Sequence, residues 1–110
     1  METVMIQCTV SSKEEARTIS HALLEARVAA CVSIAAGVES HYWWRGALEH
    51  ADEALLVIKT TRDRFDDVRR VILQHHSYEV PEIIAVPIVA AHRPYLDWLA
   101  HSVSDEEAGI

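Results

Sequence analysis

The spacing of apolar residues along the chain divides it into short strands and helices. From Val4 to Val10 every second residue is apolar or cysteine, which predicts a strand. From Ala16 to Ala26 apolar residues recur every three or four positions, which predicts a helix, and Ser12 forms a capping box at its start. The same reasoning predicts strands over residues 3–10, 28–44, 53–60 and 83–89, and helices over 13–27, 62–75 and a short stretch from Pro94.

The order of these elements, βαββαβ followed by a terminal helix, predicts an α+β domain of the ferredoxin-like kind. We expect one domain over residues 1–110, with a frayed tail at about 104–110. The strand 28–44, bent at Gly37, is long against a usual length of about six residues. Its hairpin, which turns at Arg45 and Gly46, should therefore project from the body.

The tip of this projecting hairpin is aromatic, since it carries Tyr42, Trp43 and Trp44. Aromatic side chains on a projecting hairpin favour self-association, because pairing with another copy would remove them from water. The helices would also cover only one face of the sheet. These features predict an oligomer built through the hairpin.

Charge and composition restrict the classes of partner. The net charge of −7 disfavours nucleic acid, because a phosphate backbone would be repelled. No apolar run approaches the roughly 18 residues that span a bilayer, so no membrane segment is expected. The beginning of the chain lacks the basic region of a signal peptide. The two cysteines, Cys8 and Cys31, are therefore expected to be reduced thiols of a cytoplasmic protein.

Five short stretches along the chain form a recognisable series of motifs. The most specific is the stretch from His76 to Ile84, which reads HSYEVPEII. The supporting stretches are Ala29 to Val32, the hairpin residues Tyr42, Trp44 and Gly46, the pair Lys59-Thr60, and Pro94 to Trp98. In this order they resemble the CutA family of divalent-cation tolerance proteins, whose signature HPYEVPEI differs from the first stretch by a proline in place of Ser77. The resemblance implies a ferredoxin-like fold, a tight homotrimer and a role linked to copper and other divalent metals. It also implies a distant likeness to the trimeric PII signalling proteins.

The strand and helix directions bring one thiol and two imidazoles to the same edge of the predicted sheet. Cys8 lies near the end of strand 3–10, and His75 and His76 end the helix 62–75. The copper ligands proposed for the CutA family fall on these three positions. A thiolate with imidazoles suits copper, and also zinc or another divalent cation. Adjacent helical side chains point about 100° apart, so one of the two histidines is expected to ligate and the other to support it.

Structural roles for the same residues remain open alternatives. Cys8 is in phase with the buried side of its strand, and His75 could be a solvated residue at a helix end. Cys31 is expected in the core, too far from Cys8 for a disulfide. The histidines His41, His50, His92 and His101 are expected to be exposed and without a role.

A second group of residues could form either an interface or a pocket between subunits. Its members are Tyr42, Trp44, Lys59, Tyr78, Glu79 and Trp98. One interpretation is interface packing with a Glu79–Lys59 ion pair. The other is a site for a small ligand between subunits, as the PII likeness would suggest.

Three functions compete at this point. The first is a trimeric, copper-binding protein of metal tolerance without catalysis, and the second is a PII-like signalling or adaptor module that binds a small molecule at subunit interfaces. The third is a cysteine hydrolase using Cys8, His76 and Glu79. It is disfavoured because a nucleophile needs an exposed thiolate, whereas Cys8 is in a buried phase. The chain is therefore expected not to be an enzyme.

Overall fold

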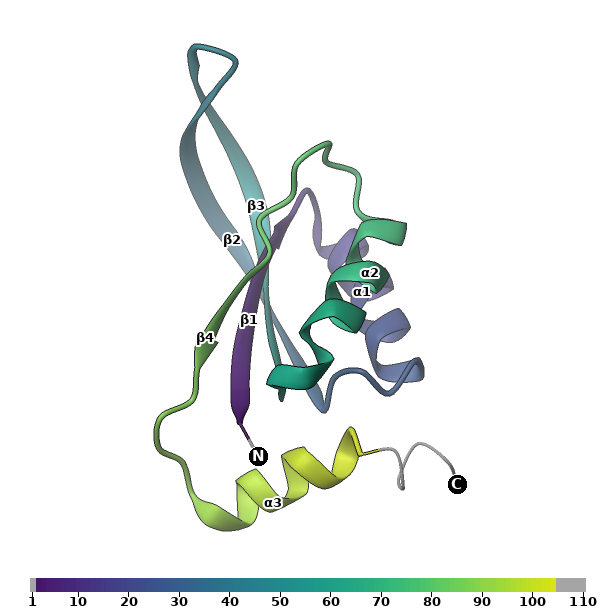
Figure 1. Ribbon diagram of the computed structural model, residues 1–110. Helices are drawn as coiled ribbons and strands as arrows, with labels where there is room; N and C mark the ends of the chain where they lie inside the picture. Colours follow the sequence, from purple (N-terminus) through teal and green to yellow (C-terminus); the bar gives the residue numbers. More distant parts are fainter. Residues whose placement is uncertain (1, 105–110) are drawn as a thin grey trace.

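The computed structural model describes residues 2–104, and it confirms the ferredoxin-like α+β arrangement (Figure 1). The strands are β1 (Thr3–Val10), β2 (Cys31–Trp44), β3 (Ala47–Thr61) and β4 (Ile84–Pro87), and the helices are α1 (Lys13–Glu25), α2 (Phe65–His75) and α3 (Arg93–Ser102). A single 3-10 turn, Arg62–Arg64, leads into α2. The sheet order is β2-β3-β1-β4, with antiparallel neighbours throughout. Apart from Ser104, the expected frayed tail lies outside the described residues.

The core lies between one face of the sheet and the helices α1 and α2, which run side by side over that face (Figure 1). The alternating residues of β1 that point to this face, including Ile6 and Cys8, are fully buried. Ile19 of α1 and Ile72 of α2 meet them from the helical side. The helix α1 begins as predicted, because the Ser12 hydroxyl accepts a hydrogen bond from the backbone N–H of Glu15.

The hairpin is longer than its apolar pattern indicated. The strand β3 begins at Ala47 and not at 53, because the ladder with β2 continues to the two-residue turn. Both turn residues, Arg45 and Gly46, have positive φ, which is the backbone of a tight hairpin turn. Gly37, at φ 77°, lies within a register shift between Ala35 and Val38, so the predicted bend is a β-bulge.

Two other strand boundaries were predicted wrongly. Residues 28–30 precede β2, since the chain leaves α1 through Arg27 at a positive φ and needs these residues to turn back to the sheet. The last strand covers Ile84–Pro87 only, a shorter range than 83–89. Cys31 is partly exposed, which corrects its expected place in the core. It faces away from the helices, on the face opposite its strand neighbour Val32.

None of the helices within residues 2–104 covers the centre of the second face of the sheet. Met5 and Val86 are cross-strand partners on that face, and Val86 keeps 40% of its surface exposed. Figure 1 shows α3 crossing below the lower end of the sheet, while the hairpin of β2 and β3 projects at the opposite end. Trp43 on the hairpin is 73% exposed. No helix among residues 2–104 has both the length and the apolar content to cross a bilayer.

Candidate functional site

The end of β1 and the end of α2 meet at one edge of the sheet, as their directions predicted. The backbone of His76 leaves the helix in an extended conformation. The Nε2 atom of its ring lies 2.8 Å from the carbonyl oxygen of Thr9, and the Nδ1 atom accepts a hydrogen bond from the backbone N–H of Tyr78 at 3.1 Å. Since a carbonyl only accepts and a backbone N–H only donates, these contacts select the tautomer with its hydrogen on Nε2.

Cys8, the residue before Thr9, points to the helical side of the sheet and is fully buried. Burial raises the pKa of the Cys8 thiol to about 12, and the nearby carboxylates of Glu82, Glu15 and Glu53 contribute in the same direction. The thiol is therefore protonated and shielded at neutral pH. This environment matches the structural alternative for Cys8 and excludes an exposed thiolate nucleophile.

His75 points to different surroundings from His76. It lines a shallow hollow beside the start of α1, together with Ser11, Ser12, Glu14, Glu15 and Thr18. Cys8, His75 and His76 thus share one sheet edge but face three separate environments. Within residues 2–104 of a single chain, no three His, Cys, Asp or Glu side chains already converge as a metal-binding set.

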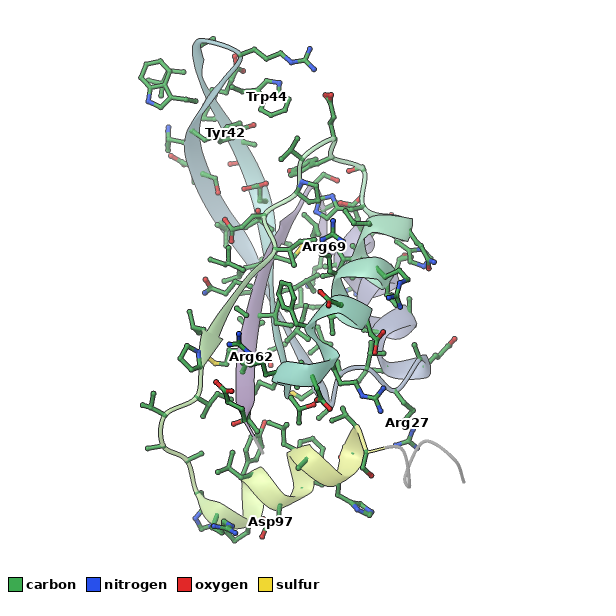
Figure 2. All side chains as sticks on the ribbon, viewed as in Figure 1. Arg27, Tyr42, Trp44, Arg62, Arg69 and Asp97 are labelled. Atoms are coloured by element: carbon green, nitrogen blue, oxygen red, sulfur yellow. The ribbon has the colours of Figure 1, made fainter. Side chains whose placement is uncertain are left out.

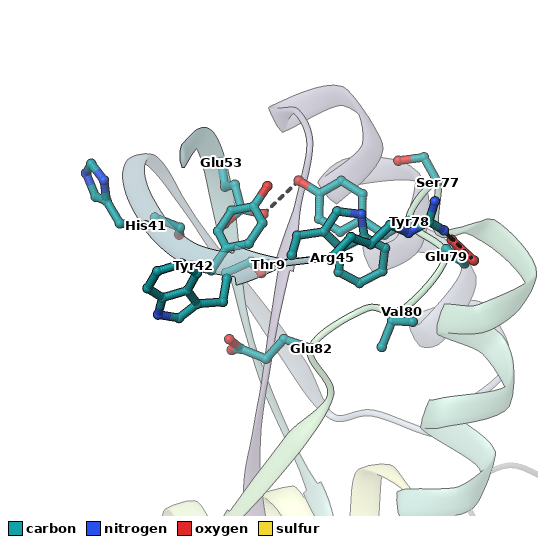
Figure 3. A pocket seen from close by; sticks show the side chains of 13 residues that line it. Thr9, His41, Tyr42, Arg45, Glu53, Ser77, Tyr78, Glu79, Val80 and Glu82 are labelled. Carbon is teal, nitrogen blue, oxygen red and sulfur yellow. Dashed lines mark hydrogen bonds and ion pairs between the residues drawn. The ribbon is translucent and has the colours of Figure 1, made fainter. Parts of the chain in front are cut away.

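A larger hollow of about 900 Å³ lies between the hairpin and the segment that follows α2 (Figure 3). Four of the six residues predicted for an interface pocket line it, namely Tyr42, Trp44, Tyr78 and Glu79. Its other lining residues are Thr9, Ser40, His41, Trp43, Arg45, Glu53, Ser77, Val80 and Glu82. Aromatic rings and carboxylates therefore surround the same space.

Two polar pairs bridge this hollow. The hydroxyl of Tyr78 donates to the buried carboxylate of Glu53 at 2.7 Å, and burial together with this bond raises the pKa of Tyr78. At the rim, the Arg45 guanidinium donates to Glu79 at 2.7 Å and lies 5.2 Å from the centre of the Trp44 ring. Glu79 therefore pairs with Arg45, and the expected pair with Lys59 is not formed within the chain.

Lys59 and Trp98 lie away from the hollow, since Trp98 belongs to α3 and Lys59 contacts that helix. The Nζ atom of Lys59 donates to the Tyr95 hydroxyl at 3.4 Å and lies 3.8 Å from the Cys31 sulfur. This bond with Tyr95 raises the pKa of Lys59. Figure 2 places Tyr42 and Trp44 near the hairpin tip and Asp97, the neighbour of Trp98, at the far end of the molecule. The six residues thus form two groups within one chain.

Sequence reasoning missed three residues that organise this edge: Thr9, Arg45 and Glu53. Thr9 acts through its backbone oxygen, which has no signal in a sequence. Arg45 was interpreted only as a turn residue, although its place at the tip would have made it a candidate partner for Glu79. Glu53 lies where β3 changes from polar to apolar residues, and its carboxylate is buried. No sequence pattern around it predicts this burial.

Comparison with known proteins agrees with this architecture. The CutA1 divalent ion tolerance protein family matches residues 4–102. A divalent-cation tolerance protein CutA from Thermus thermophilus is 48% identical over 99 residues, covering 90% of this chain and 95% of that protein. A crystal structure of CutA1 from Oryza sativa superposes with a TM-score of 0.92 at 35% identity, covering 96% of both chains. The periplasmic divalent cation tolerance protein CutA from Archaeoglobus fulgidus gives 0.90 at 38% identity, covering 93% of this chain and 99% of that one.

These matches define a class of small ferredoxin-like proteins of metal tolerance with a long central hairpin. The chain belongs to the CutA1 divalent ion tolerance protein family. The family is one of non-catalytic metal-tolerance proteins, and the prediction that this chain is not an enzyme is confirmed on that ground. The predicted ferredoxin-like fold is likewise confirmed.

Proposed function

We propose that this chain acts in metal tolerance as a copper-binding homotrimer, with Cys8, His75 and His76 as the candidate ligands. Membership of a divalent ion tolerance family supports a metal as the ligand. The contact between His76 and Thr9 is the main support for this site, because it holds an imidazole beside the residue that follows Cys8. Sulfur and imidazole together favour copper over the other first-row divalent ions, with zinc as the next candidate.

Binding at this edge requires a local rearrangement. An ion at Nε2 of His76 would replace the hydrogen bond to Thr9, and the Cys8 thiol would have to lose its proton. Metal binding can drive that loss, because thiolate is the form that ligates. Copper binding should therefore release protons and weaken as the pH falls.

The test is a Cu²⁺ titration of the wild type, Cys8→Ala and His76→Gln by calorimetry. Cys31→Ala is the matched control, since Cys31 is the other free thiol and lies on the opposite face of the sheet. We expect the first two variants to lose affinity by about tenfold or more, and the control to bind as the wild type does. Unchanged stoichiometry and affinity in Cys8→Ala would refute the thiol ligand.

The homotrimer is supported by the uncovered sheet face and by the hairpin. Leu48 on the hairpin is 66% exposed and Ile84 of β4 is 49% exposed. Association with further copies would remove these apolar side chains from water. Native mass spectrometry should give three times the chain mass. Replacing Trp43, the most exposed aromatic residue of the hairpin, by Glu should shift the distribution toward monomer. A monomer in the wild type at micromolar concentration would contradict the trimer.

Small-molecule binding is the second candidate function, and the hollow beside the hairpin favours it. Its volume of about 900 Å³ and its aromatic and carboxylate lining suit a drug-sized ligand. A thermal-shift screen with nucleotides and metabolites should find a hit that Trp44→Ala abolishes. Trp98→Ala is the control, because Trp98 lies outside the hollow. A broad panel without any hit would argue against this function.

We also propose that the protein is cytoplasmic. Two free cysteines support a reducing compartment. Relatives are named as chloroplastic in Oryza sativa and periplasmic in Archaeoglobus fulgidus, so location differs within the family. A fluorescent fusion followed by fractionation would test the location, and a signal confined to an extracytoplasmic fraction would contradict it.

A further inference from the structure

Four side chains with metal-binding groups lie on one face of the hairpin, away from Cys8 and His76. The ladder pairs His41 of β2 with His50 of β3, and two positions further along it pairs Glu39 with Asp52. Residues directly opposite each other in a ladder point to the same face, as do residues two apart on one strand. The four side chains therefore form a patch about 5 Å across the strands and about 7 Å along them.

Two of the four are already in contact. The Nε2 atom of His41 lies 2.7 Å from a carboxylate oxygen of Glu39, and the ring centres of His41 and His50 are 5.7 Å apart. The hydrogen bond with His41 and the positive charge that His41 and His50 can carry lower the pKa of Glu39.

We propose that Glu39, His41, His50 and Asp52 form a second binding site for a divalent transition metal ion such as Cu²⁺ or Zn²⁺. Two imidazoles and two carboxylates suit these borderline ions. When one tetrahedral ion binds both Nε2 of His41 and the Glu39 oxygen, with usual metal–ligand bond lengths, these two atoms lie about 3.3 Å apart. Their observed distance of 2.7 Å needs only a small expansion when the shared proton is replaced.

The other two ligands would have to reach such an ion by side-chain rotation, since no three of these groups converge in residues 2–104 as they stand. His50 stands directly opposite His41, and Asp52 stands opposite Glu39. Opposed carboxylates repel each other across a ladder, and a cation between them would reverse that cost. In the single chain the patch is open to ions, since the side chains of His41 and Glu39 are 59% and 69% exposed. Figure 3 shows the His41 ring directed away from Tyr78 and Glu53.

The hairpin turn gives this site a rigid frame. A two-residue turn leaves no freedom of register between the strands, so the pairing of His41 with His50 is set by the chain itself. All four side chains come from the same hairpin of one chain. The site is independent of Cys8, His75 and His76, and therefore of the proposed copper site at the sheet edge.

The experiment titrates Cu²⁺ into the wild type and into His41→Gln, His50→Gln and the double variant, with calorimetry as the readout. His21→Gln is the matched control, because His21 is an exposed histidine on α1. We expect one binding event to weaken by about tenfold or more in each hairpin variant and to persist in His21→Gln and Cys8→Ala. Substoichiometric Cu²⁺ should also broaden the side-chain NMR signals of His41 and His50 in the wild type.

The outcomes separate the two metal sites. A double variant that binds like the wild type, with sharp His41 and His50 signals in the wild type, would overturn the hairpin site. Loss of all binding in Cys8→Ala alone would also overturn it, while supporting the copper site at the sheet edge. Loss in the hairpin variants with unchanged binding in Cys8→Ala would establish the hairpin site alone.

Discussion

The Nε2 atom of His76 donates its hydrogen to the carbonyl oxygen of Thr9 across 2.8 Å, although the two residues are 67 positions apart. The same ring accepts a hydrogen bond from the backbone of Tyr78. One imidazole therefore ties the end of β1 to the segment that follows α2. His76, a candidate metal ligand, therefore also stabilises the sheet edge on which it lies.

Replacing His76 by alanine should lower the free energy of unfolding by about 1–2 kcal/mol, because a partly buried carbonyl and a backbone N–H both lose their partner. Urea denaturation at one fixed protein concentration measures the difference. His75→Ala is the control and should stay within about 0.5 kcal/mol, since its side chain is exposed. Equal effects of the two substitutions would contradict the structural role of His76.

Tyr78→Phe should destabilise the fold by about 1.5–3 kcal/mol, because it removes a hydrogen bond to a carboxylate that is only 8% exposed. Glu53 would be left buried without this donor. In the double variant Tyr78→Phe/Glu53→Gln, the combined cost should be smaller than the sum of the two single costs. Thermal unfolding of the four proteins gives this comparison, and strict additivity would show that the pair is not coupled.

Alkylation should distinguish the two cysteines in the native protein. Cys8 is fully buried with a raised pKa, so iodoacetamide should leave it unmodified at neutral pH. Cys31 is partly exposed and should react. Peptide mass spectrometry after labelling gives the modified fraction at each site, and labelling in denaturant, where both thiols should react, is the control. Native labelling of Cys8 at the rate of Cys31 would contradict the buried site.

Acid should destabilise the protein partly through Glu15. Burial would raise the pKa of Glu15, but hydrogen bonds from Ser77 and Ser11 outweigh burial and lower it. Because the folded-state pKa lies below the unfolded one, this carboxylate stabilises the fold above the unfolded pKa. That stabilisation is lost as the pH falls through the folded pKa.

Glu15→Gln should therefore show a shallower loss of stability than the wild type between about pH 5 and pH 3. Glu14→Gln is the matched control, because Glu14 is an acidic neighbour in the same first turn of α1. Urea midpoints measured across this range give the comparison. Parallel curves for the wild type and Glu15→Gln would refute the contribution of Glu15.

The pairing of the outer part of the hairpin, from Val38 to Trp44, could have been predicted from its turn. Once Arg45 and Gly46 are taken as a two-residue turn, Trp44 must face Ala47, and counting back places His41 opposite His50. Both histidines were instead expected to have no role, because each was considered alone. The strand residues after the turn, such as Glu49 and Asp52, are polar on both faces and carry no period-two signal.

The amino-acid sequence was sufficient for the element order, the buried phase of β1 and the sheet edge that Cys8 and His76 share. These depend on the periods of strands and helices and on the handedness of crossovers, which are local or topological rules. The sequence alone did not predict which groups the exposed charged side chains pair with. Glu79 pairs with Arg45 and Lys59 with Tyr95 because the hairpin and α3 bring them within hydrogen-bonding distance, and such distances follow from the packing of the whole chain.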